Sequence, residues 1–160
     1  ADAPPTNANV WNNYNEYDAW AGFLAMLDPK FVAELLTTTQ TVARNTVTDG
    51  GSYETVTSKM FLPSTTEVGL ANENNIAEGT LLALFSNDAS RVAYPTAQCV
   101  NNADGYTNSG FATSKGWYWW LRTPNSSNAH NVRNVNSDGS LNNNNAYNGN
   151  NGVRPLRWTM

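Results

Sequence analysis

The side chains that most often perform chemistry in enzymes and metal centres are scarce in this chain. It has one cysteine, Cys99, and one histidine, His130. A zinc centre needs several such ligands, so this pair does not provide one. The sequence contains neither a Gly-X-Ser-X-Gly nucleophile elbow nor a glycine-rich phosphate-binding loop. Its 13 acidic residues could pair for acid–base chemistry, but none lies in a suggestive motif. The sequence therefore predicts a protein that is not an enzyme and uses no cofactor or metal.

Asparagine offers a different chemistry, that of recognition. Each side-chain amide has two N–H donors and a carbonyl acceptor. Asparagine fills 12 of the 27 positions from 125 to 151. These positions are Asn125, Asn128, Asn131, Asn134, Asn136, Asn142, Asn143, Asn144, Asn145, Asn148, Asn150 and Asn151. His130 and Tyr147 lie among them.

Three interpretations of these asparagines compete. Low-complexity disorder is disfavoured because apolar residues recur within the segment, among them Val132, Val135 and Leu141. An aggregation-prone segment is disfavoured because glycine and other turn residues interrupt each run. We favour a loop-rich surface whose side chains vary freely on a fixed frame, since asparagine suits turns and tolerates left-handed backbone.

The start of the chain carries helical signals. Aromatic residues at three-residue spacing predict helical turns over residues 11–20, with their rings packed in the core. Apolar residues over 23–36 trace a second helical stripe, which Pro29 should divide in two. Asp28 then becomes the N-cap of the helix that begins at Pro29.

Extended and helical signals alternate in the next part of the chain. Threonine and valine over residues 37–57, with Asp-Gly-Gly in the middle, predict two extended pieces joined by a turn. Residues 59–62 read as a short buried strand. A helix start is predicted at 63–67, capped by Ser64 or the threonine after it. Residues 80–85 are apolar and are predicted to be helical.

Strand signals dominate the last third of the chain. The aromatic run at 117–122 has bulky residues on both faces, which indicates a central strand covered on both sides. Residues 132–136 and 141–145 flank the turn sequence Ser-Asp-Gly-Ser and predict a hairpin. Residues 152–158 read as a final strand.

These signals together predict an α+β domain, with helices in the first half packed on a mostly antiparallel sheet in the second half. The length of 160 residues suits one domain. We expect an N-terminal linker at residues 1–10 and a single domain at 11–160.

Charge and hydropathy restrict the partners. The formal net charge is −4 and only 14% of residues are charged, so no basic field exists to attract nucleic acid or an anionic membrane. No apolar run is long enough to cross a bilayer, which predicts no membrane insertion. Cys99 has no cysteine partner within the chain, and we expect it to be a free, buried thiol.

Four ordered motifs carry a resemblance to a known family. They are WWLRTP at residues 119–124, VNSDG at 135–139, GVRP at 152–155 and FLPSTTEV at 61–68. In this combination the sequence resembles the C-type-lectin-like variable proteins of diversity-generating retroelements in phages and bacteria. The resemblance covers most of the chain from about residue 20 and implies a C-type-lectin-like fold with a variable region at about 125–151.

The resemblance also implies a function. In such systems a mutagenic reverse transcriptase randomises the adenines of a template repeat, and asparagine codons are favoured targets. The 12 asparagines, together with His130 and Tyr147, would then form a ligand-binding surface close to its template state. The implied partner is a cell-surface protein or another macromolecular ligand. The implied setting is a phage tail tip or a bacterial cell surface, with a trimer or attachment to a larger virion or surface protein as the form of display.

Alternatives to this function stay open. The chain could be a carbohydrate-binding module that uses Tyr147 and exposed tryptophans, or a structural virion protein. A degenerate enzyme of the formylglycine-generating class is a further alternative, but that chemistry needs cysteines that Cys99 alone does not supply. The Glu-Pro-Asn, Gln-Pro-Asp and Trp-Asn-Asp triplets of calcium-dependent sugar binding are absent.

Two arginines close to the asparagines, Arg122 and Arg154, are expected to have structural roles. We predict that they fasten the loop region through hydrogen bonds to backbone carbonyls or to a carboxylate such as that of Asp138. A role as ligand-binding cations is the alternative.

Overall fold

The computed structural model describes residues 24, 27–101, 103 and 110–159. The linker predicted at 1–10, the helical turns predicted at 11–20 and most of the stripe before Pro29 lie outside the described residues. Within them the fold is α+β, with short helices and three small sheets whose strands pair antiparallel. The predicted α+β class and antiparallel pairing are therefore confirmed.

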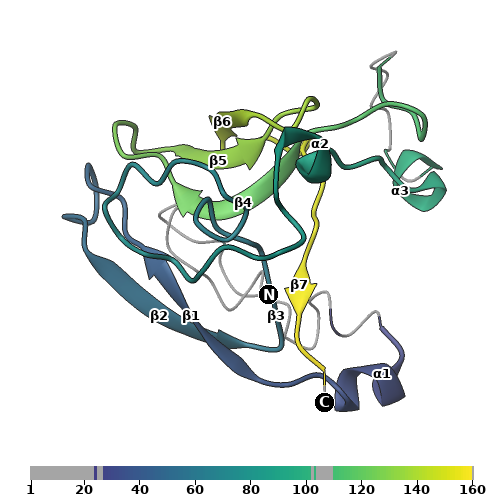
Figure 1. Ribbon diagram of the computed structural model, residues 1–160, viewed down its shortest axis with the longest axis horizontal. Helices are drawn as coiled ribbons and strands as arrows, with labels where there is room; N and C mark the ends of the chain where they lie inside the picture. The colour runs from purple at the N-terminus through teal and green to yellow at the C-terminus, as the bar shows by residue number, and fades with distance from the viewer. Residues whose placement is uncertain (1–23, 25–26, 102, 104–109, 160) are drawn as a thin grey trace.

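The elements follow one another along the chain in a mixed order (Figure 1). They are α1 (Pro29–Ala33), β1 (Thr38–Ala43), β2 (Tyr53–Ser58), β3 (Met60–Phe61), α2 (Asp88–Arg91), α3 (Ala97–Asn101), β4 (Trp119–Pro124), β5 (Asn131–Val135), β6 (Leu141–Asn145) and β7 (Leu156–Arg157). The strands form the sheets β1-β2, β3-β7 and β4-β5-β6. The predicted split into a helical first half and a sheet-forming second half is wrong, because three strands precede α2 and α3.

Local sequence signals explain the elements of the first half. The Asp28 carboxylate accepts a hydrogen bond from the Lys30 N–H at 2.8 Å and caps α1, with Pro29 at its first position, as predicted. The predicted strand, turn and second extended piece are β1 and β2. Gly50 and Gly51, at φ of 72° and 71°, allow the chain to reverse between them.

Two predicted helices are absent from the described chain. At 63–67 the capping pair forms, since Ser64 Oγ accepts from the Glu67 N–H and the Glu67 carboxylate accepts from the Ser64 N–H, but only a turn follows. Residues 80–85 form a turn rather than a helix. The Leu82 N–H donates to the Glu67 carbonyl at 2.9 Å, so a contact distant in sequence replaces the helical hydrogen bond.

The last third of the chain follows its prediction more closely. The β5–β6 hairpin forms with the predicted turn, and β4 pairs with β5 through Trp119 and Val135. On its other edge, the backbone of β4 bonds to Gly152. In its sheet β4 is an outer strand and not the central strand predicted, but it is covered on both faces as predicted, because five of its six residues are buried. The final strand is shorter than predicted, because only Leu156 and Arg157 pair with β3.

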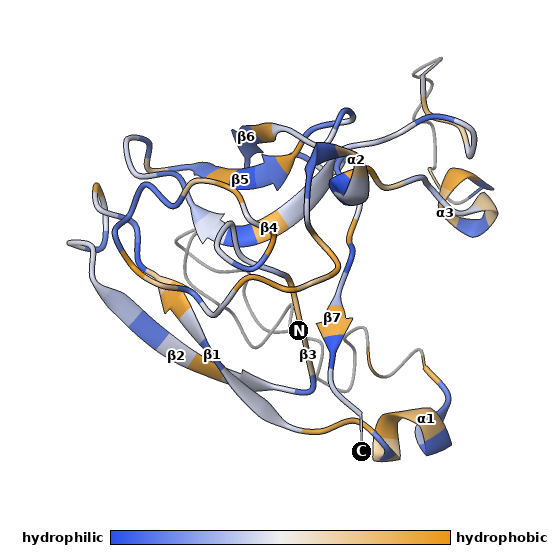
Figure 2. Cartoon of the chain, in the orientation of Figure 1, coloured by the Kyte–Doolittle hydropathy of each residue, from blue (hydrophilic) through white to orange (hydrophobic). Residues whose placement is uncertain are grey.

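The hydrophobic core lies on one face of the β4-β5-β6 sheet. Its buried members are Val68, Phe85, Trp119, Leu121 and Val135. Side chains alternate along a strand, so the neighbours of these residues on β4 and β5 point the other way. In Figure 2, β5 and β6 are coloured largely as hydrophilic, whereas much of β4 is pale.

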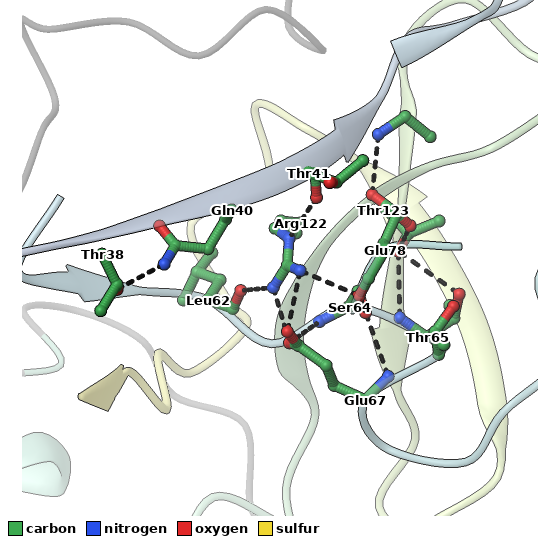
Figure 3. A network of polar contacts seen from close by, with 12 residues as sticks. Thr38, Gln40, Thr41, Leu62, Ser64, Thr65, Glu67, Glu78, Arg122 and Thr123 are labelled. Atoms are coloured by element: carbon green, nitrogen blue, oxygen red, sulfur yellow. Dashed lines mark hydrogen bonds and ion pairs between the residues drawn. The ribbon is translucent and has the colours of Figure 1, made fainter. Parts of the chain in front are cut away.

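A buried ion pair fixes the segment around β4. Arg122 donates to both carboxylate oxygens of Glu67, at 2.6 and 2.9 Å, and to the carbonyls of Thr41, Leu62 and Glu78 (Figure 3). The structural role predicted for Arg122 is confirmed. Its carboxylate partner is Glu67 and not Asp138, whose carboxylate accepts from Ser140 N–H and Oγ–H instead.

A second carboxylate lies close to this ion pair. Glu78 is fully buried and accepts hydrogen bonds from the Ala43 N–H at 2.9 Å and from the Thr123 hydroxyl. Burial outweighs these hydrogen bonds and the attraction of Arg122, and it raises the pKa of the Glu78 carboxyl above its ordinary value. The Arg122 guanidinium thus pairs with the Glu67 carboxylate, whereas at Glu78 it contacts only the backbone carbonyl.

Arg154 holds its position differently from Arg122. Its guanidinium lies over the rings of Phe85 and Trp119, at 5.1 and 5.2 Å from their centroids. Burial lowers the pKa of the Arg154 guanidinium. Arg154 is therefore attached to the aromatic core. Its role is structural, as predicted, but the contacts of its side chain within the described residues are with aromatic rings and not the predicted hydrogen bonds.

Candidate functional site

The 12 asparagines of residues 125–151 lie on the β5–β6 hairpin and on the loops at its two ends. The described contacts separate them into three groups. Some hold the backbone of the loop before β5, some form a network over β6 and the loop after it, and Asn134 is buried beneath that network. The sequence predicted one exposed set of asparagines, whereas in the structure they differ in burial and in contacts.

Asn125 belongs to the frame of the molecule. Its side chain is 6% exposed, and its Oδ1 accepts from the N–H and the hydroxyl of Ser127 at 2.8 and 3.0 Å. Its carbonyl accepts from the Nδ2 of buried Asn45 at 3.0 Å. The expectation that Asn125 is a free surface side chain is wrong, because its amide closes a turn.

Asn128 and His130 belong to the same loop. Asn128 Oδ1 accepts from the His130 N–H, and the Asn128 carbonyl accepts from Asn45, both at 2.9 Å. Asn128 is half-buried and the His130 side chain is exposed. Asn45 thus joins the carbonyls of Asn125 and Asn128 and fastens this loop to the turn between β1 and β2.

An ion pair between Arg133 and Glu73 fastens β5, and Glu73 also holds the loop before it. Arg133 of β5 contacts both carboxylate oxygens of Glu73, one of them at 2.7 Å from its Nε, and Glu73 also accepts from the Ser126 N–H. Burial acts to raise the pKa of Glu73, but Arg133 and Ser126 outweigh it, so the pKa lies below its ordinary value. Asn45 and Glu73 could not be identified from the sequence, because the residues of this loop and of β5 that they contact lie more than 50 positions away along the chain.

The asparagines of β6 and the following loop bond to one another. Asn148 Nδ2 donates to Asn144 Oδ1 at 2.8 Å, and Asn144 Nδ2 approaches Asn150 Oδ1 at 3.4 Å. Asn145 Nδ2 donates to the Tyr147 hydroxyl at 2.9 Å. Tyr147 is 80% exposed, and the asparagines of this network are half-exposed.

Four other predicted site residues lie on the hairpin. Asn131 Nδ2 donates to Asn143 Oδ1 at 2.6 Å across β5 and β6. Asn136 Oδ1 accepts from the Ser137 N–H at the hairpin turn. These side chains are half-exposed, and Asn142 lies opposite Asn134 in the pairing of the two strands.

A polar groove of about 480 Å³ lies within this set of asparagines. We call it the asparagine groove. Its lining residues are Trp117, Tyr118, Asn134, Asn142, Asn143, Asn144, Asn150 and Asn151. The last two come from the loop that returns to β4, where Trp117 Nε1 donates to the Asn150 carbonyl at 2.8 Å. The groove therefore joins the hairpin, the returning loop and the start of the aromatic run.

The sequence prediction included six of these eight residues. It assigned Trp117 and Tyr118 to packing, because they belong to the aromatic run of β4. Their position directly before β4, next to Gly116, was the one available signal that they border a loop. The structure thus brings two aromatic residues to the asparagines.

A second groove, mostly apolar and also about 480 Å³, adjoins the first through Trp117 and Tyr118. Tyr94, Phe111 and Cys99 lie along it. Cys99 is exposed on α3, which projects from the sheets in Figure 1, so the predicted burial of its thiol is wrong. The short helix α3 has no buried residue, and so its cysteine is not enclosed.

The described part of the chain has neither a cluster of metal ligands nor a membrane-spanning helix. Residues 24, 27–101, 103 and 110–159 contain no group of three or more histidine, cysteine or acidic side chains placed to hold a metal ion. Among the same residues, no helix is both long enough and apolar enough to span a membrane.

Comparison with protein families places the chain. A family model described as Domain of unknown function (DUF6273) matches residues 4–159. The chain belongs to this family. Comparisons with curated proteins and with solved structures found no match.

Proposed function

We propose that this protein recognises a macromolecular ligand, a cell-surface protein in the first place, through the asparagine-rich surface of the β5–β6 hairpin and its flanking loops. The observation that carries the proposal is the separation of the hairpin into two faces. Val135 and its partner Trp119 are buried in the core, while β6 and the loop after it present half-exposed amides. Binding residues tend to lie on such loops, which a rigid scaffold positions.

The proposed surface carries little charge, and its members differ in their freedom to vary. We propose Asn142, Asn143, Asn145, Tyr147 and Asn150 as its most variable positions. The side-chain hydrogen bonds of the last four join surface groups to one another, and Asn142 is half-exposed on β6. Asn125 and Asn128 belong instead to the frame, since they close the loop before β5.

The motifs at 61–68, 119–124, 135–139 and 152–155 support the finer part of the proposal. We propose that the fold is C-type-lectin-like and that the surface is the variable region of a diversity-generating retroelement, displayed on a phage tail tip or a bacterial surface. Asparagine side chains bury little apolar area and lose rotamer freedom on binding. Tight-binding versions of the surface are therefore expected to carry tyrosine, tryptophan or arginine at several positions.

The DNA around the gene tests this proposal. We expect a second, near-identical copy of the segment that encodes residues 125–151, next to a reverse transcriptase gene. The two copies should differ mainly where the repeat has adenine, and the differing codons should cluster at the proposed variable positions. Flanking DNA with neither repeat nor reverse transcriptase gene would remove the retroelement from the account.

A further inference from the structure

Asn134 is a buried amide without a partner. Its side chain is 1% exposed, and neither Oδ1 nor Nδ2 is hydrogen-bonded to any part of the chain that the structure describes. The Nδ2 of Asn151 is buried and unpaired in the same sense. Native proteins seldom leave buried polar atoms unsatisfied, because each one costs free energy. Both residues line the asparagine groove, so this one groove contains the two asparagines with unsatisfied side-chain atoms.

The pairing of the strands explains why Asn134 is in this position. Its neighbour Val135 points into the core, so Asn134 lies on the opposite face of β5, across from Asn142 of β6. The loop that carries Asn150 and Asn151 lines the same groove and returns to β4 at Gly152. The buried amide thus belongs to the groove and not to the hydrophobic core.

The lining of the groove restricts what it can bind. Its side chains are six asparagines, a tryptophan and a tyrosine, without a carboxylate, ammonium or guanidinium group. A charged ligand would lose its hydration there and gain no counter-charge. The volume of about 480 Å³ lies within the range of pockets that hold small ligands, roughly 300–1,000 Å³. The lining therefore favours a small, neutral and strongly hydrogen-bonding group.

We propose that the asparagine groove binds a neutral sugar ring. Every sugar hydroxyl can donate and accept, so two adjacent hydroxyls can satisfy Oδ1 and Nδ2 of Asn134 while a third accepts from Asn151. The C–H edge of the ring then lies against Tyr118. A planar trans peptide has its N–H and C=O on opposite sides and cannot bond both atoms of Asn134 together.

This inference rests on the proposed function, because the groove lies within the proposed recognition surface and the sugar would belong to the surface of the partner. The inference adds to the proposed function the chemical class of one group on the partner, a neutral sugar. The variable positions around the groove would then determine which sugar, or which neighbouring part of the partner, is accepted.

Nuclear magnetic resonance of the asparagine side-chain amides tests the proposal. The full chain is titrated separately with glucose, galactose, mannose and N-acetylglucosamine. We expect saturable shifts of the Asn134 and Asn151 side-chain N–H signals with at least one sugar. Asn134→Val should abolish the Asn151 shift and raise the urea midpoint, because it removes an unsatisfied buried amide. Tyr53→Ala, at an exposed position on β2 outside the proposed recognition surface, should leave the shifts unchanged.

Three results would overturn the proposal. They are the absence of saturable shifts with all four sugars, shifts that persist in Asn134→Val, and saturation of the groove by acetamide in place of a sugar. If Asn134→Val does not fold, Asn151→Ala replaces it with the same expected loss of binding. If the gene has the template repeat but the protein binds no sugar, the sugar inference fails and the proposed function stands.

Discussion

Arg122 is the residue on which the polar interior depends most. Its guanidinium contacts the carboxylate of Glu67 directly, and its charge acts to lower the pKa of the Glu78 carboxyl against the larger effect of burial. Removal of one partner of a buried ion pair costs more than the pair itself contributes, because the other charge is left uncompensated. This residue, and not the asparagine surface, is where a single substitution should be most damaging.

Arg122→Ala is expected to destabilise the fold by about 3–5 kcal/mol. The urea midpoint of the purified variant measures this. Arg133→Ala is the matched control, since its ion pair with Glu73 is partly exposed and should contribute about 1 kcal/mol or less. Equal losses in the two variants would contradict the role given to the buried pair.

Glu78 gives a prediction about pH. Its pKa in the folded protein is raised above the ordinary carboxyl value, so the protonated form is favoured by folding. The favourable contribution is complete below the unfolded pKa and is lost as pH rises through the folded pKa. Glu78→Gln keeps an acceptor for the Ala43 N–H and does not ionise. The variant should therefore gain stability relative to the parent as pH rises from 4 to 7.

Urea unfolding of both proteins across this pH range measures the difference. The free energies of unfolding should approach each other on the acidic side, where Glu78 is protonated in both states of the parent. A parent protein whose advantage over Glu78→Gln grows toward neutral pH would show that the ionised carboxylate is stabilising, contrary to the direction of its pKa.

Among the elements, the β5–β6 hairpin connects the frame to the surface. Its turn contains Gly139, at φ 90°, and a side chain there would overlap the backbone carbonyl of Asp88 next to α2. The turn therefore packs against α2, and Arg91 of α2 donates to the Gly139 carbonyl at 2.8 Å. The hairpin is held at its turn as well as through Val135.

Gly139→Ala is expected to destabilise the protein by about 1–3 kcal/mol, because the left-handed backbone and the contact with Asp88 both oppose a Cβ atom. Gly149 is the control. It has ordinary backbone and no atom within 4 Å of a Cβ built on it, so Gly149→Ala should change stability by less than about 0.5 kcal/mol. Thermal unfolding compares the two, and similar melting temperatures would show that the turn is not held by α2.

Elements that depend on nearby residues could be predicted from the sequence. Asp28 before Pro29, the Ser-Asp-Gly-Ser turn and the aromatic run of β4 each contain the signal that forms the element. Residues 80–85 could not, because their backbone bonds to Glu67, which periodicity does not reveal. The same holds for the candidate site. The sequence indicated which residues gather there, but the burial of Asn134 depends on the fold around it, which no local signal marks.

In the molecule as a whole, the residues that hold the fold form a frame, and the exposed amides form a surface attached to it. The frame comprises the core around Trp119, the Arg122 ion pair and the tethers from Asn45 and Glu73. The surface comprises the amides of β6 and the returning loop. If the division is right, substitutions in the surface change binding and leave folding intact, whereas substitutions in the frame change folding.

The melting temperature of a variant with alanine at Asn142, Asn143, Asn145 and Asn150 tests this division most directly. The single variant Asn125→Ala is measured beside it, and it should lower the melting temperature by roughly 3–10 °C, because a buried turn loses its acceptor. The fourfold variant should stay within a few degrees of the parent. A fourfold variant that melts as low as Asn125→Ala, or lower, would contradict the claim that this surface is free to vary.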